Sequence, residues 1–128
     1  MKRDEILNMP AGREMDTIIL RDILKYKPVY VQDGSLFGVV GELDCWYDED
    51  GVFVSLGTSP SNDISTAWKV VEKMKEYELH IMSGCNFKQY PNMLYGAKFE
   101  NKNWSFVALG NTAPLAICRA ALLAMVTA

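Results

Sequence analysis

The stretch NTAPLAICRAALLAM, residues 111–125, is apolar or small at almost every position. Thr112 and Pro114 favour a helix start, so this stretch predicts a helix over about 113–126. A helix that is apolar nearly all round is normally covered on more than one side. The pattern therefore predicts that this helix lies at the centre of the fold. Because a sheet covers only one side of a helix, it also predicts a second subunit, in a homo-oligomer.

Arg119 is the charged residue of this helix, and it shares a helical face with apolar neighbours. Three positions are open to its guanidinium group. The group can extend along apolar surface to water. It can pair with an acid of an opening helix, Asp16 or Glu14. It can also line a pocket and hold an anion through two hydrogen bonds.

The composition limits the class of protein. The chain has 128 residues, of which 49% are hydrophobic, enough for one domain over 1–128 with its own core. The net charge is −3, whereas proteins that hold nucleic acid by its phosphates usually have a basic excess. The longest apolar stretch is too short to span a bilayer, and the N-terminus does not have the pattern of a signal peptide. Three widely spaced cysteines (Cys45, Cys85 and Cys118) indicate reduced thiols. We expect a cytoplasmic protein that binds neither a nucleic acid polymer nor a membrane.

Hydrophobic spacing predicts the other elements. Helical spacing occurs at 11–26 and 62–76, and β-rich runs follow each of these helices. Asp50-Gly51, between two such runs, predicts a hairpin. The expected order is α-β-β-α-β-β-β-α. This is an α+β domain in which an antiparallel sheet of about five strands packs with three helices. The predicted core includes Ile18, Trp68, Val71, Leu115 and Leu122.

Signals for catalysis are weak. His80 is the only histidine of the chain, so a zinc site with two or three histidines cannot form, and a structural or surface role is the interpretation. The acidic run around Asp48 lacks the spacing of an EF-hand and predicts a solvated hairpin tip. The sequence has no GxSxG, P-loop or GxGxxG motif. We expect no enzyme, no cofactor and no metal site, and an enzyme that uses His80 or a cysteine is the third alternative.

A binding role has more support. The segment GTSPSND (57–63) places hydroxyls and amides directly before a helix. The first N–H groups of a helix are either capped by such side chains or bind an anion of a ligand, and Thr112 gives the last helix the same choice. Trp46 and Tyr47 are neighbours in a predicted strand, so they face opposite sides and one is expected to be exposed. An exposed ring beside helix ends and an arginine is a receptor for a nucleotide-like ligand. The candidate ligand-binding residues are Trp46, Tyr47, Ser59, Ser61, Asn62, Trp104 and Arg119.

Three segments, in the same order, resemble the phage ABA-sandwich domain family, small proteins from phages and prophages of Gram-positive bacteria. They are EILNMPAGREMD (5–16), SNDISTAWKVVEKM (61–74) and TAPLAICRAALLAM (112–125). The apolar, hairpin-like 35–57 departs from the family, and 77–110 matches only in pattern. The resemblance implies an α+β sandwich and a phage origin, and it transfers no catalytic residues. Since the first and last motifs occur together, it favours the pairing of Arg119 with Asp16 or Glu14.

The phage origin that the resemblance implies suggests two functions by analogy. The first is a non-enzymatic protein that sequesters a nucleotide-derived immune signalling molecule in the cytoplasm of the infected host cell. The alternative is a protein–protein adaptor or inhibitor that binds a host or phage protein through its apolar hairpin 35–57.

Overall fold

The computed structural model describes residues 1–34, 36, 38–83 and 93–127. Its elements are α1 (Arg3–Asn8), α2 (Arg13–Ile18), the π-helical η1 (Ile19–Ile23), β1 (Lys27–Tyr30), β2 (Leu43–Tyr47), β3 (Phe53–Val54), α3 (Ile64–Lys73), β4 (Glu78–Ser83), β5 (Tyr95–Glu100), β6 (Ser105–Gly110) and α4 (Ala113–Thr127). The α+β class and the helices expected near 11–26, 62–76 and 113–126 are confirmed. The sequence predicted one sheet of about five strands. In the described part of the chain, six strands form two three-stranded sheets.

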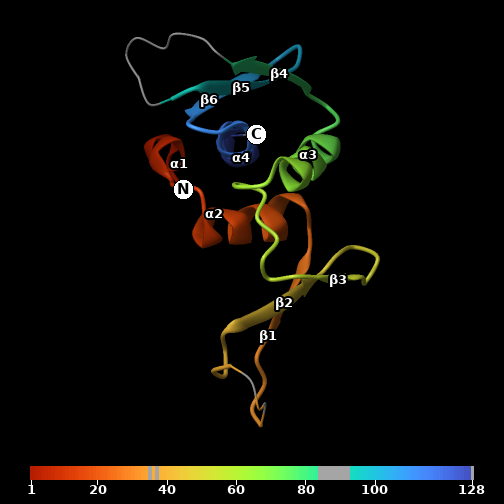
Figure 1. Cartoon of the computed structure of the whole chain (residues 1–128). Helices are drawn as coiled ribbons and strands as arrows, with labels where there is room; N and C mark the ends of the chain where they lie inside the picture. Colours follow the sequence, from red (N-terminus) through yellow and green to blue (C-terminus); the bar gives the residue numbers. More distant parts are fainter. Residues whose placement is uncertain (35, 37, 84–92, 128) are drawn as a thin grey trace.

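The elements stack in layers (Figure 1). The sheet β4-β5-β6 lies at one end, and α4 lies against it between α1 and α3. α2 and η1 form the next layer, and the sheet β1-β2-β3 follows at the other end. Neighbouring strands pair antiparallel in both sheets. The second sheet and its connections extend beyond the helices, and we call the described residues of 27–56 the arm.

The last helix is enclosed by its own chain. α4 contacts β5 and β6 on one side and α1, α3 and η1 on others. Every residue from Pro114 to Ala124 is buried, including the predicted core residues Leu115 and Leu122. The premise that a sheet alone would cover this helix is therefore wrong. Because three other helical segments cover α4, its apolar surface gives no reason for a second subunit.

The buried face of α3 differs from the predicted one. Trp68 was expected in the core, but it is 50% exposed. The buried face instead runs through Ala67 and Val70, which are fully buried, with Val71 only partly buried. α3 packs on α4, a helix rich in buried alanine. Two helices that approach through small side chains leave no room for an indole ring, so Trp68 turns to solvent.

The hairpin predicted at Asp50-Gly51 is present between β2 and β3. The carboxylate of Asp48 accepts hydrogen bonds from the backbone N–H groups of Asp50 and Val52, both at 2.9 Å. Gly51 has φ +80°, a conformation that glycine adopts without strain. Asp48 thus shapes the turn, and the exposed Glu49 and Asp50 lie at a solvated hairpin tip, as predicted.

The junction of β6 and α4 allows no side chain at Gly110. A Cβ atom there would lie 2.8 Å from the backbone nitrogen of Ala116 and 3.1 Å from the carbonyl oxygen of Thr112. We predict that Gly110→Ala lowers the free energy of unfolding by about 1–3 kcal/mol, because the strand and helix must move apart. Gly57→Ala is the control, since its Cβ would meet only the Ser55 hydroxyl at 3.6 Å. Equal urea midpoints for the two variants would contradict this close packing.

Candidate functional site

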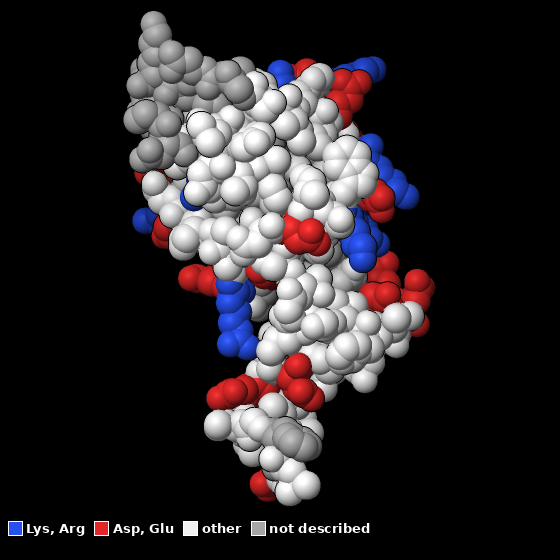
Figure 2. Space-filling model, in the orientation of Figure 1, with Lys and Arg blue, Asp and Glu red and all other residues white. Residues whose placement is uncertain are grey.

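A cleft of about 470 Å³ lies between α2, the strand β2 and the loop that precedes α3. Its apolar wall comes from Leu20 of η1 and from Leu43 and Trp46 of β2. Its polar side comes from the loop, whose Ser59 and Asn62 line the opening. Figure 2 shows a recess between the helices and the arm, with both acidic and basic side chains at its margin. The cleft therefore offers one apolar and one hydrogen-bonding wall.

Asp16 holds the loop in place against α2. This carboxylate is buried, and it accepts a hydrogen bond from the Ser59 hydroxyl at 2.5 Å and one from the Ser61 backbone N–H at 2.9 Å. The Ser61 hydroxyl in turn accepts from the backbone N–H of Gly12 at 2.9 Å. Asn62 donates to the Ser59 oxygen at 3.0 Å. The polar wall of the cleft is thus a connected hydrogen-bond network that fixes the loop.

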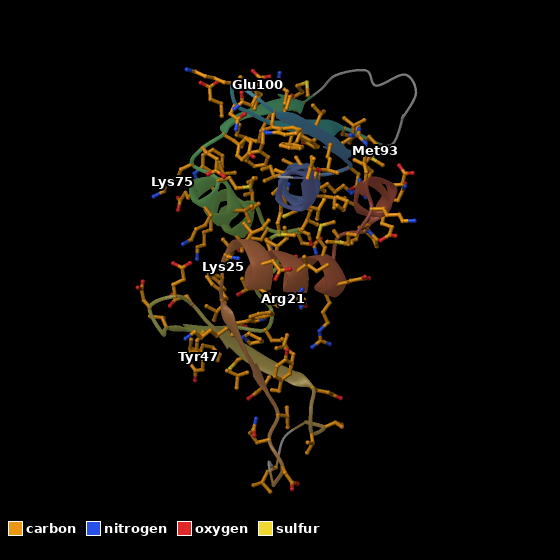
Figure 3. The ribbon with its side chains drawn as sticks, turned by 180° about the vertical axis from the view of Figure 1, so that it is seen from behind. Arg21, Lys25, Tyr47, Lys75, Met93 and Glu100 are labelled. Atoms are coloured by element: carbon orange, nitrogen blue, oxygen red, sulfur yellow. The ribbon has the colours of Figure 1, made fainter. Side chains whose placement is uncertain are left out.

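Trp46 and Tyr47 point to opposite faces of the arm, as their adjacent positions in a strand predict. Trp46 pairs with Pro28 and Val54 on the face toward the helices, and it is 1% exposed. Tyr47 is 39% exposed on the outer face, where its ring meets that of Phe53 edge to face at 6.5 Å. Figure 3 shows Tyr47 on the arm, away from the helical layer. Trp46 is therefore a wall of the cleft, and Tyr47 is outside it.

The helix N-termini considered as anion sites are capped by side chains. Asp63 accepts hydrogen bonds from the Thr66 backbone N–H at 3.2 Å and from the Thr66 hydroxyl at 2.7 Å. The pKa of Asp63 lies below its usual value, mainly because the Thr66 hydroxyl donates a hydrogen bond to the carboxylate. At α4, the Thr112 hydroxyl accepts from the backbone N–H of Leu115 at 3.3 Å. Capping, rather than an open anion site, is what the structure shows at both ends.

The ion pair predicted for Arg119 is wrong. Arg119 is 5% exposed, and among the described residues its guanidinium has no ion pair with Asp16 or Glu14. Nε and Nη2 donate to the carbonyl oxygen of Met9 at 3.1 and 2.9 Å, and Nη1 donates to that of Leu109 at 2.8 Å. Met9 ends α1, where carbonyl groups lack partners in the helix and carry partial negative charge. Arg119 is therefore a buried structural cation, and burial lowers its pKa.

The structure brings three of the seven predicted binding residues to the cleft, namely Trp46, Ser59 and Asn62. Ser61 lies directly behind it, fully buried. The remaining predicted residues do not line the cleft: Tyr47 faces outward and Arg119 lies in the core. Trp104 lies beside β6, where its ring stacks on that of Phe106 with centroids 5.9 Å apart.

The alternatives for catalysis gain no support from the described residues. His80 lies on an exposed strand, 3.5 Å from a carboxylate oxygen of Glu78. Cys45 and Cys118 are buried free thiols, and burial raises the pKa of Cys118 far above its usual value. Cys85 lies outside the described residues. Within the part of the chain that the structure describes, no group of three or more histidine, cysteine or acidic side chains could hold a metal ion.

Two residues of the site were missed by sequence reasoning. Asp16 was considered only as a partner of Arg119. Its place beside Met15 and three residues before Ile19, in a helix with hydrophobic spacing, was a signal that the carboxylate is buried and needs hydrogen-bond donors. Arg13 lines the same cleft from the start of α2, where it is exposed. No sequence pattern distinguishes Arg13 from the other surface arginines, because only the packing of the arm opposite α2 places it at a cleft.

The fold is thus an α+β sandwich, with helices between two antiparallel sheets. The family model of the phage ABA sandwich domain matches residues 21–122, and the chain belongs to this family. The expected family membership is confirmed, and the family supports a phage protein. No curated protein matches the chain. A 2.0 Å crystal structure of a phage protein from Bacillus cereus ATCC 14579 is similar, with a TM-score of 0.59 and 24% sequence identity over 90% of this chain and 92% of that one.

Among the described residues, no helix combines the length and the apolar character that crossing a membrane requires.

We predict that Arg119→Met lowers the free energy of unfolding by about 2–4 kcal/mol. The substitution keeps an apolar stem but leaves the buried carbonyl groups of Met9 and Leu109 without their donors, which costs more than removing a buried charge gains. Arg21→Met is the matched control, because Arg21 forms an exposed pair with Asp22 that is worth little. Chemical denaturation of both variants measures the difference, and equal stability would show that Arg119 does not hold α1 in place.

We predict that Asp16→Ala frees the loop that forms the polar wall of the cleft. The variant should lose about 2–3 kcal/mol of stability, because the buried N–H of Ser61 loses its acceptor. Hydrogen exchange at the Ser61 amide should accelerate more than exchange in α4. Asp22→Ala, which removes an exposed carboxylate, should leave that amide protected. An unchanged rate at Ser61 in Asp16→Ala would contradict the network.

Proposed function

We propose that this protein binds and sequesters a nucleotide-derived signalling molecule without converting it, as a counter-defence factor in the cytoplasm of the infected host cell. The observation that supports this proposal is the cleft, in which three predicted binding residues, Trp46, Ser59 and Asn62, meet at one site. A cleft with an apolar wall and a few placed hydrogen-bonding groups is typical of small-molecule sites.

The chemistry of the lining residues favours binding over turnover. The carboxylate of the cleft, Asp16, accepts two hydrogen bonds from the loop and is engaged in holding it. Arg13 at the rim offers a positive charge for a phosphate, which a guanidinium can hold through two parallel hydrogen bonds. Thr17, also in the lining, donates its hydroxyl hydrogen to the carbonyl of Arg13 at 2.7 Å. A phosphate-bearing ring compound fits this set of groups.

The second candidate function is a protein–protein adaptor, and the exposed surface of the arm favours it. In the connection between β1 and β2, Leu36 is 92% exposed, and Val39 and Val40 are exposed near it in the chain; Phe53 is exposed on β3. Apolar residues that gather on a projecting element mark interaction sites in other proteins. This surface, rather than α4, would also mediate assembly of the proposed homo-oligomer, which light scattering at micromolar concentration would detect.

One retention experiment separates these functions. The purified protein is incubated with a panel of adenine-nucleotide messengers, passed through a desalting column and heated, and the released compounds are chromatographed. We predict recovery of an intact ligand. A chemically altered ligand would indicate an enzyme. If no compound is retained, the protein–protein adaptor is the remaining candidate function.

A variant pair locates the retained ligand. Arg13→Gln should reduce retention about tenfold or more, because it removes the charge at the rim of the cleft. Arg3→Gln removes an exposed arginine of α1 that does not line the cleft, and this variant should retain the ligand as wild type does. Equal retention by both variants would place the ligand elsewhere.

A further inference from the structure

A second compartment adjoins the cleft along α2. Its volume is about 590 Å³, and it lies between α2 and the Tyr30–Leu43 end of the β1–β2 ribbon. The two compartments share three lining residues, Arg13, Thr17 and Leu43. They are therefore neighbouring parts of one groove, and Arg13 lies where they meet.

The second compartment offers an exposed aromatic ring. A register shift between Val29 and Tyr30 brings Tyr30 opposite Leu43, which lines the cleft with Trp46, so Tyr30 lies on the same face of the arm as Trp46. This face is turned toward the helices, and Ile18 of α2 lines the compartment opposite Tyr30. Tyr30 is 49% exposed, unlike the buried Trp46. A planar ring can therefore stack on Tyr30 over an apolar floor.

The charges along the groove have a defined order. At the junction, Arg13 offers its guanidinium, and none of the ion pairs found in the described residues involves it. Glu14 and Glu42 lie at the second compartment. Carboxylates accept hydrogen bonds from hydroxyl and amino groups, and they repel phosphates. An anionic group therefore fits the junction, and a neutral ring or sugar fits the outer compartment.

We propose that the groove binds a dinucleotide: two ring systems joined through phosphate, with one ring unit in each compartment and the phosphate at Arg13. This inference rests on the proposed function and makes it more specific. It names the ligand class as a two-headed compound rather than a mononucleotide.

Calorimetric titration tests the proposal with four compounds. They are ADP and diadenosine diphosphate, and the corresponding guanine compounds. We expect at least one of the two dinucleotides to bind about tenfold or more tightly than its mononucleotide, because the second ring gains a stacking contact. If a mononucleotide binds and its dinucleotide binds no more tightly, this inference is overturned and the proposed function stands. If none of the four compounds binds, both are overturned.

Two tyrosine variants locate the second ring. Tyr30→Ala should lower the affinity for the dinucleotide to that for the mononucleotide, and it should leave mononucleotide binding unchanged. Tyr47→Ala is the matched control, because Tyr47 is a half-exposed tyrosine on the opposite face of the same sheet. Equal losses in the two variants, or no loss in Tyr30→Ala, would overturn the placement. Thermal unfolding of both variants shows that each is folded.

Discussion

The fold depends on the burial of one helix on all sides within a single chain. α4 is apolar around its whole circumference, so every neighbour must offer it an apolar face, and β5, β6, α1, α3 and η1 do so. A helix enclosed in this way leaves its neighbours few positions to take. The close approach at Gly110 and the alanine-lined contact with α3 both follow from that enclosure. The second sheet does not cover α4. It packs on α2 and η1, one layer further out, which leaves the arm free to project.

Arg119 shows how such an enclosed helix can carry a charge. Its guanidinium meets the carbonyl group that ends α1 and a carbonyl group of β6, an edge strand of its sheet. The Met9 carbonyl lies at a helix end, where carbonyl groups lack donors, so the buried arginine satisfies it and joins three elements through one side chain. Met93, which Figure 3 shows near α1, places its sulfur 4.0 Å from the same group. A carboxylate partner is not needed for the burial of this cation, because oriented carbonyl dipoles solvate it.

The elements that sequence reasoning predicted are those with strong local signals. The apolar composition of 113–126, the Asp50-Gly51 turn and the caps at Asp63 and Thr112 each depend on a few neighbouring residues. Trp68 was misplaced because helical spacing fits two overlapping faces of α3, and only the alanine-rich surface of α4 selects between them. The pairing of Arg119 and the convergence of Arg13 and Tyr30 at a groove depend on contacts between distant segments. Local patterns in a single sequence do not predict contacts between distant segments. The hydroxyl-rich segment 57–63 was predicted to cap a helix or to bind a ligand. Asp63 caps α3, and Ser59 and Asn62 line the cleft, where the binding of a ligand stays a prediction.

The two candidate functions use opposite faces of the same arm. Trp46, Leu43 and Tyr30 line the groove, Leu43 because the β1–β2 ladder shifts register beside it, whereas Tyr47 and its strand partner Phe53 lie on the outer face. Alternation along a strand thus separates a face that can hold a small molecule from a face that can meet a protein. Because the two faces belong to the same arm, ligand binding on one face can be coupled to partner binding on the other. A ligand that fills the groove would bridge the arm and α2 and add contacts between them. Any partner bound on the outer face would then contact a stiffer arm, so that binding on one face can influence affinity on the other.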